Sequence, residues 1–234
     1  MARIRKNGNG NGEHSNWMVT YASLLTAVLA FFLLFINRAE NEAAATFKFP
    51  ERLKNRLYAQ IMQAKTDRQL DWLYVENTGT KGIKLLIPSK IGATPMFRSE
   101  SDQLEAPFQP YLEQVVEIVN GLGLESVQEQ YATILDRLRH AGKEITIDVT
   151  IEGHTDRLPL RSTRFASNWE LSLARSYQVL QYFQQHTRLP QEYYSLAGYG
   201  PFHPLRDIRN LDENRRVEIY INIQMTDLQE DRRV

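Results

Sequence analysis

The chain has 234 residues, which is enough for one well-packed domain beside a shorter segment. Lysine plus arginine and aspartate plus glutamate each number 28, so the chain lacks the basic excess that is typical of nucleic-acid-binding domains. It contains no cysteine, which excludes a disulfide framework.

Residues 17–36 carry no charged side chain and follow a basic stretch at residues 3–6. As a helix with about 1.5 Å rise per residue, they would span roughly 30 Å, the thickness of a bilayer's hydrocarbon core. A secretory signal peptide would have a shorter apolar run and a small-residue cleavage site, whereas this run continues to Ile36. We therefore expect a single-pass membrane protein, with residues 1–16 as a cytoplasmic tail because positive residues stay inside.

Hydroxyl-bearing residues recur at every third position within this apolar segment. Thr20, Ser23 and Thr26 form a strip on one side of the predicted helix. Because polar side chains inside a membrane usually face protein, we expect this strip to contact another helix and not lipid.

Residues 37–80 are expected to form a periplasmic linker with one amphipathic helix at about 51–71. The apolar side chains Leu53, Leu57 and Ile61 recur there every four residues. Such a stripe needs an apolar surface to cover it. Two interpretations stay open: the helix is a stalk or packs on the folded domain, or its stripe docks on a partner or on the membrane surface.

Residues 81–226 are expected to form the folded domain, with a polar tail at 227–234. Alternating apolar and polar residues predict one-sided strands, and helical spacing predicts amphipathic helices between them. The expected strands are 145–152, 217–224 and, with a weaker pattern, 82–87 and 193–197; the expected helices are 104–119, 127–138 and a third that begins with a capping box at 167–170. This order predicts the α/β class, as a two-layer α/β sandwich.

Four motifs in the second half of the chain resemble the OmpA-like peptidoglycan-binding domain. They read IEGHTDRLPL, SNWELSLARS, LAGYGPFHP and NRRVEIYI, and they are most similar to MotB-type flagellar stator subunits. The likeness covers roughly residues 82–223. The apolar stretch WMVTYASLLTAVLAFF also resembles the MotB signature W-x-x-x-Y-A-D-x-x-T-x-x-x-x-FF. The resemblance implies a bacterial inner-membrane stator subunit with a periplasmic domain.

The resemblance also implies partners. The wall ligand would be the diaminopimelate of the peptidoglycan stem, and a homodimer of this chain would sit inside a ring of five MotA-like subunits. The segment after the membrane helix acts as a plug against ion leakage in such proteins, and Leu53, Leu57 and Ile61 match its position. No cofactor and no nucleic-acid partner is expected.

Asp156 and Arg175 match the family's ligand-binding aspartate and arginine. A carboxylate and a guanidinium a few ångströms apart would bind the ammonium and the carboxylate at the free end of diaminopimelate. Further matches fall on Asn168 and Leu171 at the start of the helix motif, on Arg216 in the NRRVEI motif and on Thr155 beside the aspartate. The alternative is that Asp156 and Arg175 pair with each other, or that Asp156 caps a loop.

His154 lies two residues before Asp156 and raises the question of catalysis or metal binding. No second histidine lies close in sequence, and a nucleophile would need its own base and an orienting group. We therefore expect His154 to pack or to bond a loop, and we expect neither a metal site nor an enzyme.

Ser23 is the main departure from the family. In MotB-type stators an aspartate follows Tyr-Ala and carries the translocated ion, whereas this chain reads Tyr21-Ala22-Ser23. A serine hydroxyl has no titratable charge at accessible pH, so ion-driven rotation is in doubt, and a non-transporting wall anchor is the alternative function. A second departure is an extra helical segment at 125–142, for which we predict no chemistry.

Overall fold

The computed structural model describes residues 13–161, 164–205 and 214–228, and it divides into two compact units, Met1–Phe47 and Lys48–Val234. Most of the predicted cytoplasmic tail and of the predicted C-terminal tail lies outside the described residues. The units are treated separately below.

The first unit contains one long helix, α1 (Glu13–Phe47). Within it, Trp17–Arg38 forms a stretch of 22 residues with a mean hydropathy of 2.3, long and apolar enough to cross a membrane. The Ser23 hydroxyl donates a hydrogen bond to the Val19 carbonyl at 2.8 Å, and Thr26 donates to the Ala22 carbonyl at 2.8 Å. Both hydroxyls are therefore bonded within their own helix, as is common for serine and threonine in helices.

The second unit is built on a five-stranded sheet with the order β1-β2-β7-β5-β6. Only β5 and β6 run parallel; the other pairs are antiparallel. The strands are β1 (Tyr74–Asn77), β2 (Ile83–Pro88), β5 (Lys143–His154), β6 (Tyr194–Gly200) and β7 (Arg216–Asp227), and a separate short hairpin joins β3 (Lys90–Ile91) to β4 (Thr94–Pro95). The four predicted strands are present as β2, β5, β6 and β7, and β1, β3 and β4 are additions.

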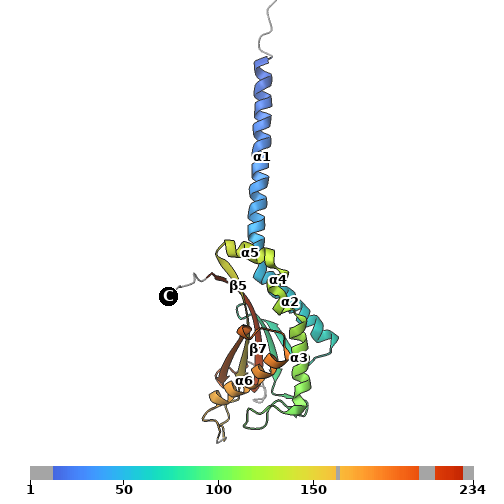
Figure 1. Cartoon of the computed structure of the whole chain (residues 1–234), viewed down its shortest axis with the longest axis vertical. Helices are drawn as coiled ribbons and strands as arrows, with labels where there is room; N and C mark the ends of the chain where they lie inside the picture. The colour runs from blue at the N-terminus through green and yellow to red at the C-terminus, as the bar shows by residue number, and fades with distance from the viewer. Residues whose placement is uncertain (1–12, 162–163, 206–213, 229–234) are drawn as a thin grey trace, which may run out of the picture. The chain divides into compact units, whose positions relative to one another are not determined.

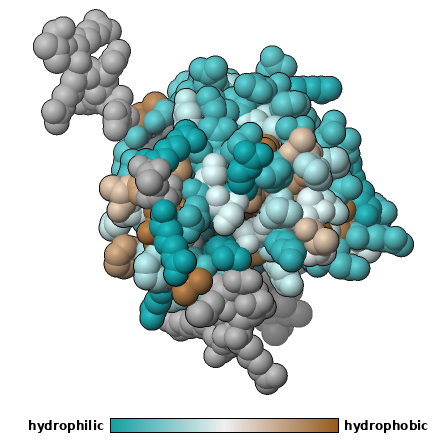
Figure 2. Space-filling model, turned by 90° about the horizontal axis from the view of Figure 1, so that it is seen from below, coloured by the Kyte–Doolittle hydropathy of each residue, from teal (hydrophilic) through white to brown (hydrophobic). Residues whose placement is uncertain are grey.

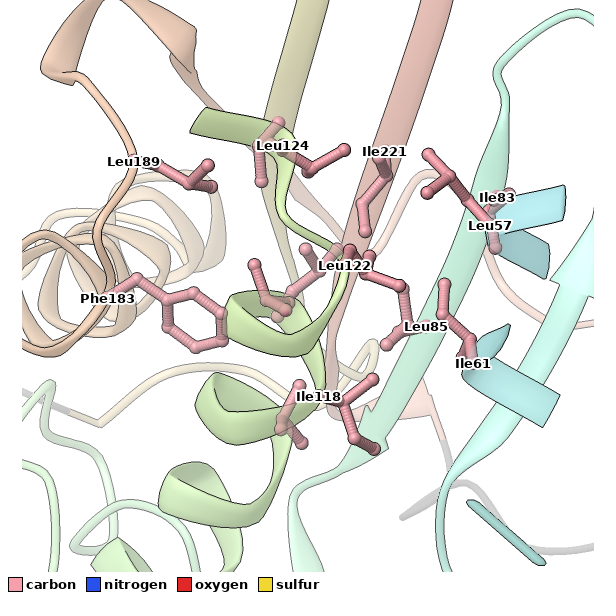
Figure 3. Close-up of a cluster of buried hydrophobic side chains, with 14 of the residues drawn as sticks. Leu57, Ile61, Ile83, Leu85, Ile118, Leu122, Leu124, Phe183, Leu189 and Ile221 are labelled. Carbon is pink, nitrogen blue, oxygen red and sulfur yellow. The ribbon is translucent and has the colours of Figure 1, made fainter. Parts of the chain in front are cut away.

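The helices of this unit pack on one face of the sheet, which confirms the expected α/β architecture. They are α2 (Phe49–Asp67), α3 (Gln109–Gly121), α4 (Val127–Gln130), α5 (Ala132–His140) and α6 (Asn168–His186), with 3-10 turns at Ala106–Phe108, Leu124–Ser126 and Gln191–Tyr193. Figure 3 shows Phe183 of α6, Ile118 of α3 and Ile221 of β7 in one cluster of buried hydrophobic side chains. The predicted extra segment at 125–142 is α4 and α5.

The helix α2 belongs to this core, although residues 37–80 were predicted to be a linker. Its stripe of Leu53, Leu57 and Ile61 is buried, with Ile61 fully so. Figure 3 shows Leu57 and Ile61 beside Ile83 and Leu85 of β2. The folded unit therefore begins at Lys48 and not near residue 81, because this apolar stripe is covered by the domain's own sheet. The structure agrees with the packing interpretation, and the plug role stays a prediction.

The helix α6 lies directly on the ends of β5 and β6. A Cβ atom added at Gly153 of β5 would lie 2.1 Å from the Ser172 carbonyl oxygen, and one at Gly198 of β6 would lie 2.6 Å from the Leu173 nitrogen. Only residues without a side chain allow this approach. The predicted cap is present at the start of α6, where the Ser167 hydroxyl accepts from the Glu170 amide at 3.2 Å.

The outer surface of the second unit is mainly polar on the side shown in Figure 2, where hydrophobic residues are scattered among hydrophilic ones. Scattered apolar residues are normal on a surface that faces water.

Candidate functional site

A cavity of about 630 Å³ opens where β5 ends and α6 begins. The loop after β5 contributes Thr155 and Asp156, α6 contributes Asn168, Leu171 and Arg175, and the residue before β7 contributes Arg215. We call this cavity the wall pocket. It brings together five of the six residues that were predicted to bind peptidoglycan.

Asp156 is buried in the wall pocket with only 6% of its surface exposed. Its Oδ1 accepts a hydrogen bond from the Leu158 amide at 3.1 Å, and its Oδ2 accepts from Nη1 of Arg215 at 3.1 Å. The loop-capping alternative is therefore part of its role. Each carboxylate oxygen has a further lone pair, so Asp156 can still accept a hydrogen bond from a ligand.

Arg175 is also buried, at 9% exposure, and its guanidinium lies over the Phe97 ring with 5.2 Å from Cζ to the ring centroid. Nε donates to the Ser101 carbonyl at 2.9 Å, while neither Nη atom has a partner among the described residues. Burial lowers the pKa of Arg175 to about 10, and Arg215 acts in the same direction while Asp156 opposes it. Arg175 thus stays charged at neutral pH, with donors available to the cavity.

Asp156 and Arg175 do not pair with each other in the described part of the chain, because Asp156 forms its ion pair with Arg215. Asn168 has a supporting position, since its Nδ2 donates to the Leu158 carbonyl at 2.8 Å and holds the loop that follows Asp156. Leu171 is a buried part of the pocket wall. The Thr155 amide donates to the Gly200 carbonyl at 3.0 Å, whereas its buried hydroxyl has no partner among the described residues.

Arg216 does not line the wall pocket with the other predicted residues; its neighbour Arg215 does. Successive residues of a strand point to opposite faces of a sheet, so a difference of one position decides on which face the arginine side chain lies. Arg215 precedes β7 and reaches Asp156, while Arg216 opens β7 and its Nε donates to Glu218. The motif contains both arginines side by side, and the sequence held no signal to choose between them.

Arg216 lines a second cavity of about 480 Å³ on the sheet face that points away from α6. Besides Arg216, its charged and polar members from the sheet are Lys84 of β2, Glu152 and His154 of β5, Tyr199 of β6, and Glu218 and Tyr220 of β7. Lys81 and His203 line it from neighbouring loops. We call this cavity the sheet-face pocket. Sequence reasoning considered His154 alone, because the other members are distant in the chain.

Burial and the neighbouring charges shift the pKa values in the sheet-face pocket. Burial lowers the pKa of His154 to about 4, and Arg216, His203 and Lys81 also lower it, while Glu218 opposes them. Burial raises the pKa of Glu152, with Lys81 opposing. For Glu218 burial alone would raise the pKa, but Arg216 and the Tyr220 hydroxyl outweigh it and leave the pKa below its usual value. At neutral pH His154 is therefore uncharged.

His154 was predicted to pack or to bond a loop, and the structure shows packing alone. Its ring stacks on Tyr199 at 5.5 Å between centroids, but neither ring nitrogen has a hydrogen-bond partner among the described residues. With 4% of its surface exposed, such an unsatisfied polar side chain is unusual.

Comparison with known proteins agrees with this architecture. A model of the OmpA family matches residues 96–218, more than half of the chain, and a model described as membrane MotB of the proton-channel complex MotA/MotB matches residues 2–49. A crystal structure of a putative MotB-like protein from Desulfovibrio vulgaris has the same fold, with a TM-score of 0.51 and 19% identity over 77% of this chain and 98% of that one.

Similar sequences span nearly the whole chain. The uncharacterized protein YtxE of Bacillus subtilis is 28% identical, with 95% of each chain covered. Motility protein B of the same organism is 25% identical over 94% of this chain and 96% of its own length. Motility protein B of Helicobacter pylori strain J99 is 25% identical over 91% and 87%. The chain therefore belongs to the OmpA family and has the MotB-type arrangement, in which a MotB membrane segment precedes an OmpA domain.

Proposed function

We propose that this chain is a MotB-like subunit that anchors an inner-membrane complex to peptidoglycan through the wall pocket. One observation carries the proposal: the pocket joins the buried carboxylate of Asp156 to the buried guanidinium of Arg175, whose Nη donors have no partner among the described residues. A buried carboxylate and a buried guanidinium in one pocket are complementary to a zwitterion.

The proposed ligand is the free end of the diaminopimelate residue in the peptide stem. Its ammonium would donate to Asp156, and its carboxylate would accept two parallel hydrogen bonds from Arg175. Arg215 fixes the Asp156 carboxylate, and Phe97 fixes the plane of the Arg175 guanidinium. Both charges are already desolvated, so the ligand would meet groups that are oriented before it binds.

The test is a pull-down of the purified full chain on peptidoglycan. Asp156→Ala and Arg175→Ala should each weaken binding by about 2 to 5 kcal/mol, because each leaves the ligand's opposite charge unpaired in a buried site. Asp136→Ala is the matched control, since Asp136 is a charged residue in an exposed ion pair on α5. Binding equal to wild type by both pocket variants, with unchanged thermal melting, would overturn the proposal.

The membrane part of the proposal follows from the same family. The N-terminus would be cytoplasmic because its positive residues stay inside, and the domain of residues 48–234 would be periplasmic. Two copies of the chain would pair through α1 inside a ring of five MotA-like subunits. We assign no enzymatic activity to the complex. Copurification from membranes, followed by mass determination of the intact complex, tests the stoichiometry directly.

A second candidate function is a wall anchor that moves no ions. It is favoured by Ser23, whose hydroxyl is bonded to the Val19 carbonyl of its own helix and offers no titratable charge to a transported proton. The candidates differ in what the membrane helix does, and they share the wall pocket. Ion flux in vesicles that contain the chain and its MotA-like partner distinguishes them.

A further inference from the structure

The sheet-face pocket contains three potential metal ligands that point to one another. Glu152 and His154 lie two residues apart on β5, and Glu218 lies opposite Glu152 on β7. One ligand atom from each lies within 4.8 Å of the other two. The His154 Nε2 is 3.9 Å from Glu152 Oε2 and 3.8 Å from Glu218 Oε2.

These separations are close to those of a filled site. With bonds of 2.0–2.2 Å, two ligand atoms of a tetrahedral zinc ion lie about 3.4 Å apart. A shift of roughly 0.5 Å would therefore bring the imidazole nitrogen to that separation from each of the two carboxylate oxygens. Neutral imidazole with carboxylates is a common ligand set for zinc and similar divalent ions.

His154 provides the independent observation that a ligand belongs here. Its side chain is 2% exposed, and both ring nitrogens are without a hydrogen-bond partner among the described residues. A buried imidazole loses its hydration on folding and needs a partner in return. The carboxylates at 3.8 and 3.9 Å are too far to be that partner, but a metal ion between them would be.

Hydrogen bonds orient the Glu218 carboxylate, as is usual for a metal ligand. Glu218 accepts from Arg216 Nε through Oε1 and from the Tyr220 hydroxyl at 2.6 Å through Oε2, which fixes its orientation. Outer contacts of this type orient the ligands of metal sites. Both Oε2 atoms have lone pairs left for an ion.

Lys81 is the cation that pairs with Glu152 when no metal ion is bound. Its ammonium lies 3.1 Å from Glu152 Oε1 and 4.7 Å from the centre of the Tyr220 ring. The Lys81 side chain is 55% exposed, so it can turn into solvent at little cost. A divalent ion would then replace the lysine as the partner of Glu152.

We propose that Glu152, His154 and Glu218 form a binding site for a divalent transition-metal ion such as Zn²⁺, with Lys81 as the competing cation. The site is separate from the wall pocket, since its residues face the other side of the sheet. It does not depend on peptidoglycan binding, and each proposal can fail alone.

The test uses the untagged full chain in detergent after removal of metals by a chelator. Cobalt titration followed by visible absorption, and zinc titration by calorimetry, should show one ion bound per chain. His154→Gln should abolish the cobalt spectrum and the zinc heat. A variant with glutamine at His14, His140 and His186 is the matched control and should keep both.

Lys81→Met should strengthen metal binding, whereas His154→Gln should abolish it. This variant leaves all three ligands in place. Loss of the competing ammonium should tighten zinc binding by roughly tenfold, which corresponds to about 1.4 kcal/mol. An absence of cobalt binding to the wild-type chain would overturn the proposal, as would binding that is unchanged in His154→Gln. Unchanged zinc affinity in Lys81→Met would overturn the role of Lys81 even if His154→Gln fails to fold.

Discussion

Arg215 and Arg216 are neighbours in the chain but serve opposite sides of the sheet. Arg215 donates from Nη1 to Asp156 in the wall pocket, and Arg216 donates from Nε to Glu218 in the sheet-face pocket. Because successive residues alternate between faces as the chain enters β7, Arg215 and Arg216 contribute one guanidinium to each pocket.

This division predicts different effects for the two arginines on wall binding. Arg215→Ala should weaken peptidoglycan binding by roughly tenfold, because the pocket loses a charged donor and Asp156 loses the partner that fixes it. Arg216→Ala should leave wall binding near wild type at a temperature where both variants are folded. Pull-down with matched thermal melting measures this, and the reverse order of effects would contradict the assignment of the two residues.

A second prediction concerns α2. Leu57→Ala and Ile61→Ala should each lower the free energy of unfolding by about 2 to 5 kcal/mol, as is usual when a buried aliphatic side chain is truncated. Gln60→Ala, on the exposed side of the same helix, is the control and should change stability little. Chemical denaturation measures the free energy of unfolding of all three variants. A stripe that is free to act as a plug would instead make all three substitutions nearly neutral.

A third prediction follows from the lowered pKa of His154. Its pKa is about 4 in the folded chain and near the ordinary 6.5 in the unfolded chain, so the unfolded state binds more protons between these values. Stability is therefore lost as the pH falls from 6.5 through 4, by up to about 3 kcal/mol. His154→Gln lacks this titration and should lose less stability over the same range. Denaturation of the metal-free chain and of the variant at pH 7 and pH 4 measures the difference; equal losses would contradict the prediction.

A fourth prediction concerns the membrane helix. Ser23→Asp introduces a side chain that can be neutral or charged, which a transported proton requires, whereas serine has no such states between about pH 5 and 9. We expect no proton flux from the wild-type chain with its MotA-like partner in vesicles, and pH-dependent flux from the variant. Equal flux from both chains would mean that the coupling residue lies elsewhere.

The sequence predicted those parts of the fold that depend on local pattern. The alternation along β5 and β7, and the cap at Ser167, each involve neighbouring residues, and the structure has them where they were expected. By contrast, the burial of Leu57 depends on β2 and β7, which come later in the chain, so its pattern could not show what would cover it.

The candidate sites show the same limit. Asp156 and Arg175 came from motifs and line one pocket, but the choice between Arg215 and Arg216 depended on where the strand begins. The contact of His154 with Glu218 joins residues that are far apart in the chain. Pairing of β5 with β7 creates it, and period-two spacing alone does not give the register of that pairing.

The close approach of α6 to Gly153 and Gly198 has a consequence for affinity. No layer of side chains separates this helix from the strand ends, so the helix that carries Arg175 packs directly on the strand that leads into Asp156. The distance between the two charges is then set when the domain folds, and a ligand does not have to order them. Such a pocket would prefer ligands in which the distance between the ammonium and the carboxylate matches the distance between the Asp156 carboxylate and the Arg175 guanidinium.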